Sequence, residues 1–135
     1  MIVADANLLV YLTVPGPARP LARQAFERDP DWRAPRFWRV EFRNAVLKHI
    51  RAGEFTVAEA LEFFELTREV VGEDEPEADP QTALEIALAH GISAYDAEVV
   101  AVARALGVKV VSADTGLVKA VPDTVVSLQT FASTH

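Results

Sequence analysis

The chain of 135 residues contains no cysteine and only three histidines. The absence of cysteine excludes disulfides, a thiolate nucleophile and a thiolate zinc site, and three scattered histidines argue against a histidine metal cluster. Any bound metal would therefore be held by oxygen atoms. No apolar run approaches the roughly 20 residues that span a bilayer, and the first residues lack the regions of a signal peptide. We therefore expect a cytoplasmic protein that makes no membrane contact.

Positive charge is scarce overall, and most of it lies in one segment. The net charge is −7. Residues 19–51 hold nine of the 13 Lys and Arg residues and four acids, so this segment carries +5 and the remainder carries −12. A basic segment beside an acidic remainder can follow nucleic-acid phosphates, but it can equally be a solvated helical face. Charge alone leaves both interpretations open.

Short apolar stretches alternate with segments of helical periodicity, and the length suits a single domain over residues 1–135. Helix-capping residues occur at Thr56, Asp79 and Ser93. This alternation predicts an α/β fold in which a parallel sheet is flanked by helices on both faces. The expected strands are residues 1–4, 32–35, 69–72, 108–111 and 125–128.

Two aspartates follow predicted buried strands. Asp5 ends the apolar stretch MIVA, and Asp114 ends VKVVSA. Either could simply cap the helix that follows, as could Asn7. They could also be site residues, because open α/β sheets hold their ligands at the carboxyl ends of the strands.

Two further acids lie on or beside the inner faces of predicted helices. Asp96 falls on the apolar stripe of its helix, although a capping box with Ser93 would explain an Asp there. Glu41 lies at the margin of another stripe, where it could pair with an arginine. If the four acids converge, each pair of charges ~4 Å apart repels by about 4 kcal/mol at an effective dielectric of ~20. A divalent cation would relieve this repulsion, and oxygen ligands favour Mg²⁺ or Mn²⁺.

Four segments together resemble the motifs of PIN-domain ribonucleases, specifically the VapC-type toxins of toxin–antitoxin pairs. They are VADANLLVYL, VEFRNAVLK, ISAYDAEVVAVARALG and VVSADTGL. The resemblance implies a five-stranded parallel sheet with its first and fourth strands adjacent. Ser112 stands where many relatives have Thr, and a further acid that some relatives carry a turn after Asp114 is replaced here by Leu117 and Val118. This leaves open whether one metal ion or two would bind.

The same resemblance implies roles for individual residues in hydrolysis of RNA phosphodiesters. The Arg and Lys residues of the 19–51 segment, Arg39 and Arg43 in particular, are expected to contact substrate phosphates. A VapB-type antitoxin and a second copy of the chain are expected as partners. Because Asp96 and Asp114 would make Asp5 a ligand, we expect the helix-cap role to pass from Asp5 to Asn7. The implied Mg²⁺ or Mn²⁺ ligands are Asp5, Glu41, Asp96 and Asp114, supported by Asn7 and Ser112.

Other classes remain open. A haloacid-dehalogenase phosphatase needs a second Asp where Asn7 stands, and a receiver domain needs a Lys ending its last strand, whereas Lys109 lies inside a predicted strand. The chain could also be a catalytically idle PIN-like module that binds a protein through an apolar face. That face would comprise Phe63, Leu66 and Val70.

Overall fold

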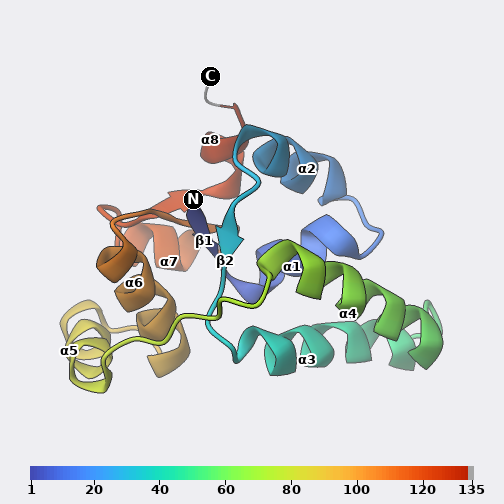
Figure 1. Cartoon of the computed structure of the whole chain (residues 1–135), viewed down its shortest axis with the longest axis horizontal. Helices are drawn as coiled ribbons and strands as arrows, with labels where there is room; N and C mark the ends of the chain where they lie inside the picture. The colour runs from blue at the N-terminus through green and yellow to red at the C-terminus, as the bar shows by residue number, and fades with distance from the viewer. Residues whose placement is uncertain (134–135) are drawn as a thin grey trace.

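The computed structural model describes residues 1–133, which form eight helices and four strands (Figure 1). In chain order these are β1 (Ile2–Ala4), α1 (Ala6–Thr13), α2 (Arg19–Arg28), β2 (Trp32–Arg33), α3 (Trp38–Arg51), α4 (Val57–Val71), α5 (Pro80–His90), α6 (Ala94–Leu106), β3 (Val110–Ser112), α7 (Thr115–Ala120), β4 (Val125–Ser127) and α8 (Leu128–Ser133).

The strands form one parallel sheet in the order β2-β1-β3-β4. Val3 of β1 pairs with Arg33 on one side and with Val110 on the other. The chain therefore moves from β1 outward to β2 in one direction and to β3 in the other. This makes the crevice beyond the carboxyl ends of β1 and β3 a topological switch point, where open α/β sheets bind ligands. The predicted adjacency of these two strands is confirmed.

The prediction of five strands is wrong, because within residues 1–133 the sheet has four. Residues 69–71 of the expected third strand instead finish α4. Thr56 and Glu59 make both hydrogen bonds of a capping box at the start of this helix. Once a helix is nucleated, each further residue adds a hydrogen bond at little entropic cost, so the β-branched Val70 and Val71 continue it. Gly72 ends it at a φ of 75°, which favours glycine.

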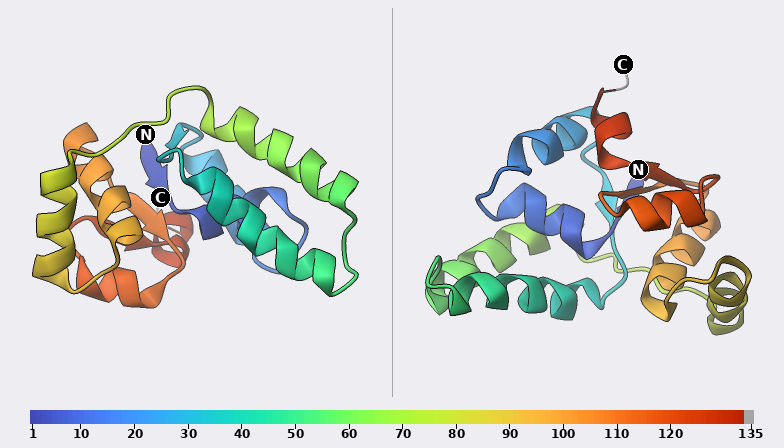
Figure 2. Two further views of the ribbon diagram at one scale, coloured as in Figure 1. Left: turned by 90° about the horizontal axis from the view of Figure 1, so that it is seen from below. Right: turned by 180° about the vertical axis from the view of Figure 1, so that it is seen from behind.

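Helices cover both faces of the sheet, as expected (Figure 2). An apolar core lies on each face. Ile2 and Ala4 of β1 pack with α1, α2, α3, α4 and α8, whereas Val3 packs with α5, α6 and α7. This alternation follows from the two-residue period of a strand. Within residues 1–133 no single helix is long and apolar enough to cross a membrane. The pair α5 and α6 passes that test only together, by length and composition, with a bend of 115° between them.

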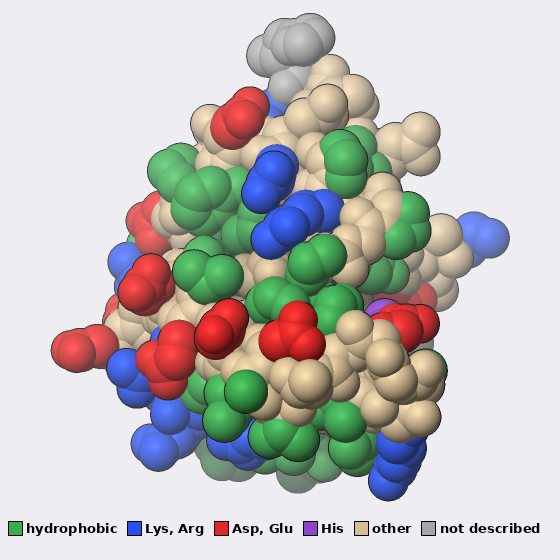
Figure 3. Space-filling view, turned by 90° about the vertical axis from the view of Figure 1, so that its right-hand side faces the viewer, with side chains coloured by type: hydrophobic (Ala, Val, Ile, Leu, Met, Phe, Trp, Pro, Cys, Tyr) green, Lys and Arg blue, Asp and Glu red, His purple; other side chains and the backbone are tan. Residues whose placement is uncertain are grey.

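The outer surface of α4 differs from the apolar face expected at Phe63, Leu66 and Val70. Phe63 and Val70 are half-buried and pack against the core, and Leu66 remains exposed. Val57 and Leu61 of the same helix are also exposed. On the side of the molecule seen in Figure 3, apolar side chains are interspersed with charged ones.

Candidate functional site

Asp5 and Asp114 follow two neighbouring strands of the sheet. Asp5 comes directly after β1, and Asp114 comes two residues after β3. Ala4 and Val111 are paired residues on these strands. The pairing brings both carboxylates to the crevice at the switch point, although 109 positions of numbering separate them.

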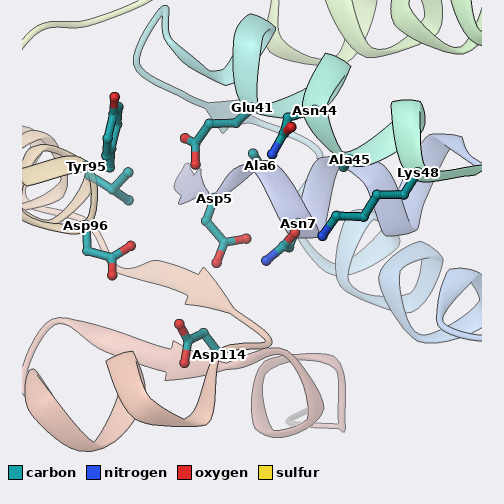
Figure 4. A pocket seen from close by; sticks show the side chains of 11 residues that line it. Asp5, Ala6, Asn7, Glu41, Asn44, Ala45, Lys48, Tyr95, Asp96 and Asp114 are labelled. Carbon is teal, nitrogen blue, oxygen red and sulfur yellow. The ribbon is translucent and has the colours of Figure 1, made fainter. Parts of the chain in front are cut away.

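Glu41 and Asp96 approach the same crevice from the first turns of α3 and α6. Figure 4 shows the four carboxylates pointing into one pocket from four separate segments. The convergence expected from the sequence is therefore present in the structure. The residues that line the pocket are Asp5, Ala6, Asn7, Glu41, Asn44, Ala45, Lys48, Tyr95, Asp96, Val99 and Asp114.

Both carboxylate oxygens of Asp5 are hydrogen-bonded. Oδ1 accepts the backbone N–H of Leu8 at 2.9 Å, and Oδ2 accepts the hydroxyl of Ser112. Asp5 is thus the N-cap of α1, and the expectation that Asn7 would take this role is wrong. The reason is local geometry: Asp5 has the extended backbone of a cap residue (φ −78°, ψ 167°), whereas Asn7 already lies inside the helix. The cap orients the carboxylate that also faces the pocket.

Asp114 is held by the same kind of bonding. Its Oδ1 accepts the backbone N–H groups of Gly116 and Leu117, so it caps α7. Its own N–H donates to Ser112 Oγ at 3.0 Å. Ser112 therefore contacts both strand-end aspartates and fixes the distance between the two turns that carry them.

Burial and mutual repulsion make the pocket unfavourable for several negative charges. Desolvation raises the pKa of Asp5 above 3.8, and the Ser112 hydroxyl partly opposes this. Desolvation is also the main cause of the raised pKa of Glu41, followed by the charges of Asp5 and Asp96. The pKa of Asp96 is raised by desolvation and then by the charge of Asp114. A bound cation would lower all three pKa values.

The donor set fits a hard divalent cation. Every acidic ligand candidate supplies carboxylate oxygen, and the asparagine side chains beside them supply amide oxygen, which suits Mg²⁺ or Mn²⁺. The pocket encloses about 170 Å³, enough for an ion with several waters at about 30 Å³ each. Within residues 1–133, however, no three acidic or histidine side chains are already arranged at ligand spacing. Ion binding would therefore draw the carboxylates closer together.

The sequence did not single out the lining residues Asn44 and Tyr95, and it indicated Lys48 only as one of the nine basic residues of the 19–51 segment. Asn44 and Lys48 share the pocket-facing side of α3 with Glu41, and their spacing of three and seven residues from Glu41 is the signal that could have found them. Tyr95 stands at the mouth of the pocket with 61% of its surface exposed, and its ring packs edge-on against Phe37 at 5.4 Å.

Arg39 and Arg43, the predicted phosphate contacts, do not line the acidic pocket; both face a neighbouring groove. Arg39 donates from Nε and Nη2 to the carboxylate of Glu75 at 2.9 and 2.8 Å. Arg43 lies over the ring of Phe64, 5.4 Å from its centroid. The structure therefore ties both guanidinium groups to other parts of the protein.

Comparison with known proteins agrees with this architecture. The model of the PIN domain family matches residues 2–121, and the chain belongs to this family. Members of the family are typically metal-dependent nucleases. The crystal structure of PAE2754 from Pyrobaculum aerophilum is similar in fold, with a TM-score of 0.76 and 20% sequence identity over 97% of this chain and 85% of that chain. No curated protein matches the sequence.

Proposed function

We propose that this PIN domain is a Mg²⁺- or Mn²⁺-dependent endoribonuclease and the toxin of a VapBC-type toxin–antitoxin pair. The observation that carries the proposal is the pocket at the switch point, where Asp5, Glu41, Asp96 and Asp114 converge from four segments. Surface carboxylates that served only solubility would not be expected to share one partly desolvated pocket. Neither a nucleophilic side chain nor a thiolate is needed for this chemistry.

Asp5, Asp96 and Asp114 are the proposed cation ligands. A bound Mg²⁺ or Mn²⁺ lowers the pKa of a coordinated water and neutralises charge on the phosphate. Hydrogen bonds orient both strand-end carboxylates toward the pocket: Asp5 accepts from Leu8 N–H and Ser112 Oγ, and Asp114 accepts from the N–H groups of Gly116 and Leu117. Such supporting hydrogen bonds orient ligands and tune their affinity.

Glu41 is the proposed proton acceptor. Within residues 1–133 its carboxylate makes no hydrogen bond and no ion pair, so it is available to orient a water and take its proton. The oxygen of that water attacks the phosphorus atom, the bond to the leaving oxygen breaks, and the leaving oxygen takes up a proton from solvent. Protonated Glu41 then returns its proton to solvent.

Cleavage of total RNA by the purified protein tests this function. We expect products with Mg²⁺ or Mn²⁺ and none with EDTA. The Asp96→Asn variant, folded as judged by circular dichroism, should lose activity by at least about 100-fold, since changes around metal ligands already cost 10- to 100-fold. Wild-type rates in Asp96→Asn would refute the assignment. Sequencing of the new RNA ends would identify the cleavage site.

Exposed apolar side chains support the proposed protein partners. On α4, Val57, Leu61 and Leu66 are exposed, and Glu62, Glu65 and Glu69 lie among them. Because these glutamates would repel the same surface of a second copy, α4 is a poor dimer interface. We propose that α4 instead binds an antitoxin segment whose apolar side chains alternate with Lys or Arg. We propose that a homodimer forms instead through α5, where Leu84 and Leu88 are 61% and 85% exposed.

Two matched double variants separate these surfaces. Leu61→Glu with Leu66→Glu should abolish co-purification with a co-expressed antitoxin and leave the dimer intact. Leu84→Glu with Leu88→Glu should give a monomer in light scattering and retain the antitoxin. The opposite pattern would reverse the assignment of the two faces.

A further inference from the structure

Lys48 is the basic residue of the acidic pocket. It lies seven residues after Glu41 and four after Asn44, so all three side chains share one face of α3. Figure 4 shows the Lys48 side chain extending from α3 toward Asn7 and the carboxylates. Among the lining residues, all of which fall within residues 1–133, Lys48 alone is cationic.

The ammonium group of Lys48 is not used by the protein. Within residues 1–133 it makes no hydrogen bond and no ion pair, although four carboxylates line the same pocket. Arg39, by contrast, pairs with Glu75, and Arg104 pairs with Asp123. Lys48 is therefore free to receive an anion from outside the chain.

Electrostatics explains why a substrate phosphate would need this cation. Four carboxylates carry a charge of −4, which one divalent ion reduces only to −2. A phosphodiester that enters this field is repelled unless a positive group meets it on the way in. Lys48 lies where the exposed end of α3 meets the pocket, whereas both predicted arginine contacts face another groove.

We propose that Lys48 binds a backbone phosphate of the RNA at the α3 edge of the pocket, next to the reacting centre. The inference rests on the proposed ribonuclease function and assigns to Lys48 the phosphate contact that the sequence had suggested for Arg39 and Arg43. Asn44, one turn earlier on the same face, offers its amide N–H groups to the same stretch of RNA.

The salt dependence of RNA binding tests this proposal without relying on catalysis. Anisotropy of a fluorescein-labelled, unstructured oligoribonucleotide is measured in Mg²⁺ over a KCl series, with Glu41→Gln as the parent so that the RNA survives. Each phosphate contact contributes about 0.7 to the slope of log K against log salt for a single strand. Lys48→Met should reduce the slope by about 0.7 and weaken binding by about tenfold at low salt. Lys48→Arg should retain the slope.

Arg51→Met is the matched control. Arg51 lies in the same last turn of α3, is exposed, and does not line the pocket, so its removal costs the helix the same terminal charge. We expect it to leave the slope unchanged. An unchanged slope in Lys48→Met, or an equal change in Arg51→Met, overturns the inference.

Metal affinity and the RNA salt slope together separate a phosphate contact from a merely charge-balancing lysine. A lysine that only neutralises the carboxylates would, when removed, tighten Mn²⁺ binding in calorimetry and leave the RNA salt slope as it was; that result overturns the proposal. Failure of the parent to bind RNA at all would overturn the ribonuclease function as well. If the parent binds RNA and Lys48→Met leaves its salt slope unaltered, only the Lys48 phosphate contact is refuted and the proposed ribonuclease function stands.

Discussion

Ser112 donates a hydrogen bond to Asp5 across 107 residues of sequence, and the same hydroxyl accepts the backbone N–H of Asp114. One buried side chain thus joins the two strand-end aspartates of the pocket. Its hydroxyl lowers the pKa of Asp5, whereas desolvation raises it. Ser112 therefore makes a buried charge more tolerable at the place where the proposed cation binds.

Replacement of this hydroxyl should be costly. We expect Ser112→Ala to lower the free energy of unfolding by about 1–3 kcal/mol, because the half-buried Asp5 carboxylate and the Asp114 N–H both lose a partner. The pKa of Asp5 should rise further, which a carbon-13 NMR titration of its carboxyl group would measure. An unchanged titration would show that Ser112 does not influence the Asp5 charge.

The pH dependence of stability without metal follows from the raised pKa values of Asp5, Glu41 and Asp96. A carboxyl group whose pKa is higher in the folded than in the unfolded state binds its proton more tightly when folded. Its contribution to stability is therefore complete below the unfolded pKa, near 3.8 for Asp and 4.5 for Glu, and is lost as pH rises through the folded pKa.

Urea denaturation in EDTA from about pH 4.5 to 7.5 measures this effect. We expect the free energy of unfolding to fall as pH rises, and to fall less in Glu41→Gln with Asp96→Asn. Asp29 and Asp79 have lowered pKa values, so their contribution to stability is present above about pH 3.8 and is lost only as pH falls below that value. They therefore do not affect the measured range. Stability that increased across this range in EDTA would contradict the prediction.

Divalent cations should reverse this loss of stability at neutral pH. An ion that binds only the folded state at 100 times its dissociation constant adds about 2.7 kcal/mol to the free energy of unfolding. We expect Mg²⁺ or Mn²⁺ to raise the melting temperature in calorimetry, while KCl at matched ionic strength does not. Asp96→Asn should be more stable than wild type in EDTA and gain little from the ion. Equal gains in both proteins would place the ion elsewhere.

The convergence of the acids could be predicted from the sequence because each lies at a local boundary. Asp5 and Asp114 end apolar strands, and Asp96 falls on an apolar helical stripe, so short-range patterns locate them. The sequence led us to expect the N-cap of α1 at Asn7 rather than at Asp5. The two positions are only two residues apart, and sequence patterns do not define the first residue of a helix that closely. Lys48 was recoverable from its spacing to Glu41 on α3.

Other features depend on contacts that no local pattern contains. The third strand expected at Val70 and Val71 is helical: Val71 is buried in the core on the α4 side of the sheet, and Val70 packs against that core. The pairing of Arg39 with Glu75 joins positions 36 residues apart, so the charge of Arg39 looked available in the sequence. Glu75 belongs to the acidic run GEDEPEADP, a pattern typical of a solvated surface, but only 10% of its side chain is exposed.

Glu75 and Asp74 provide a matched pair that tests this difference between buried and solvated acids. Glu75 accepts hydrogen bonds from Trp38 Nε1 and from two nitrogens of Arg39, at 2.8–2.9 Å. Asp74, with 68% of its side chain exposed, pairs only with Arg33. The bonds of Glu75 hold the first turn of α3, the turn that carries Glu41 to the pocket.

We therefore expect Glu75→Ala to lower the free energy of unfolding by about 2–4 kcal/mol, because it leaves an indole N–H and a guanidinium group without their partner. Asp74→Ala should cost less than about 1 kcal/mol, since exposed ion pairs contribute little. Urea denaturation of both variants measures the difference. If the two losses were equal, Glu75 would be no more than a surface charge, and the position of Glu41 would have to depend on the packing of Trp38 and Phe42 against the core.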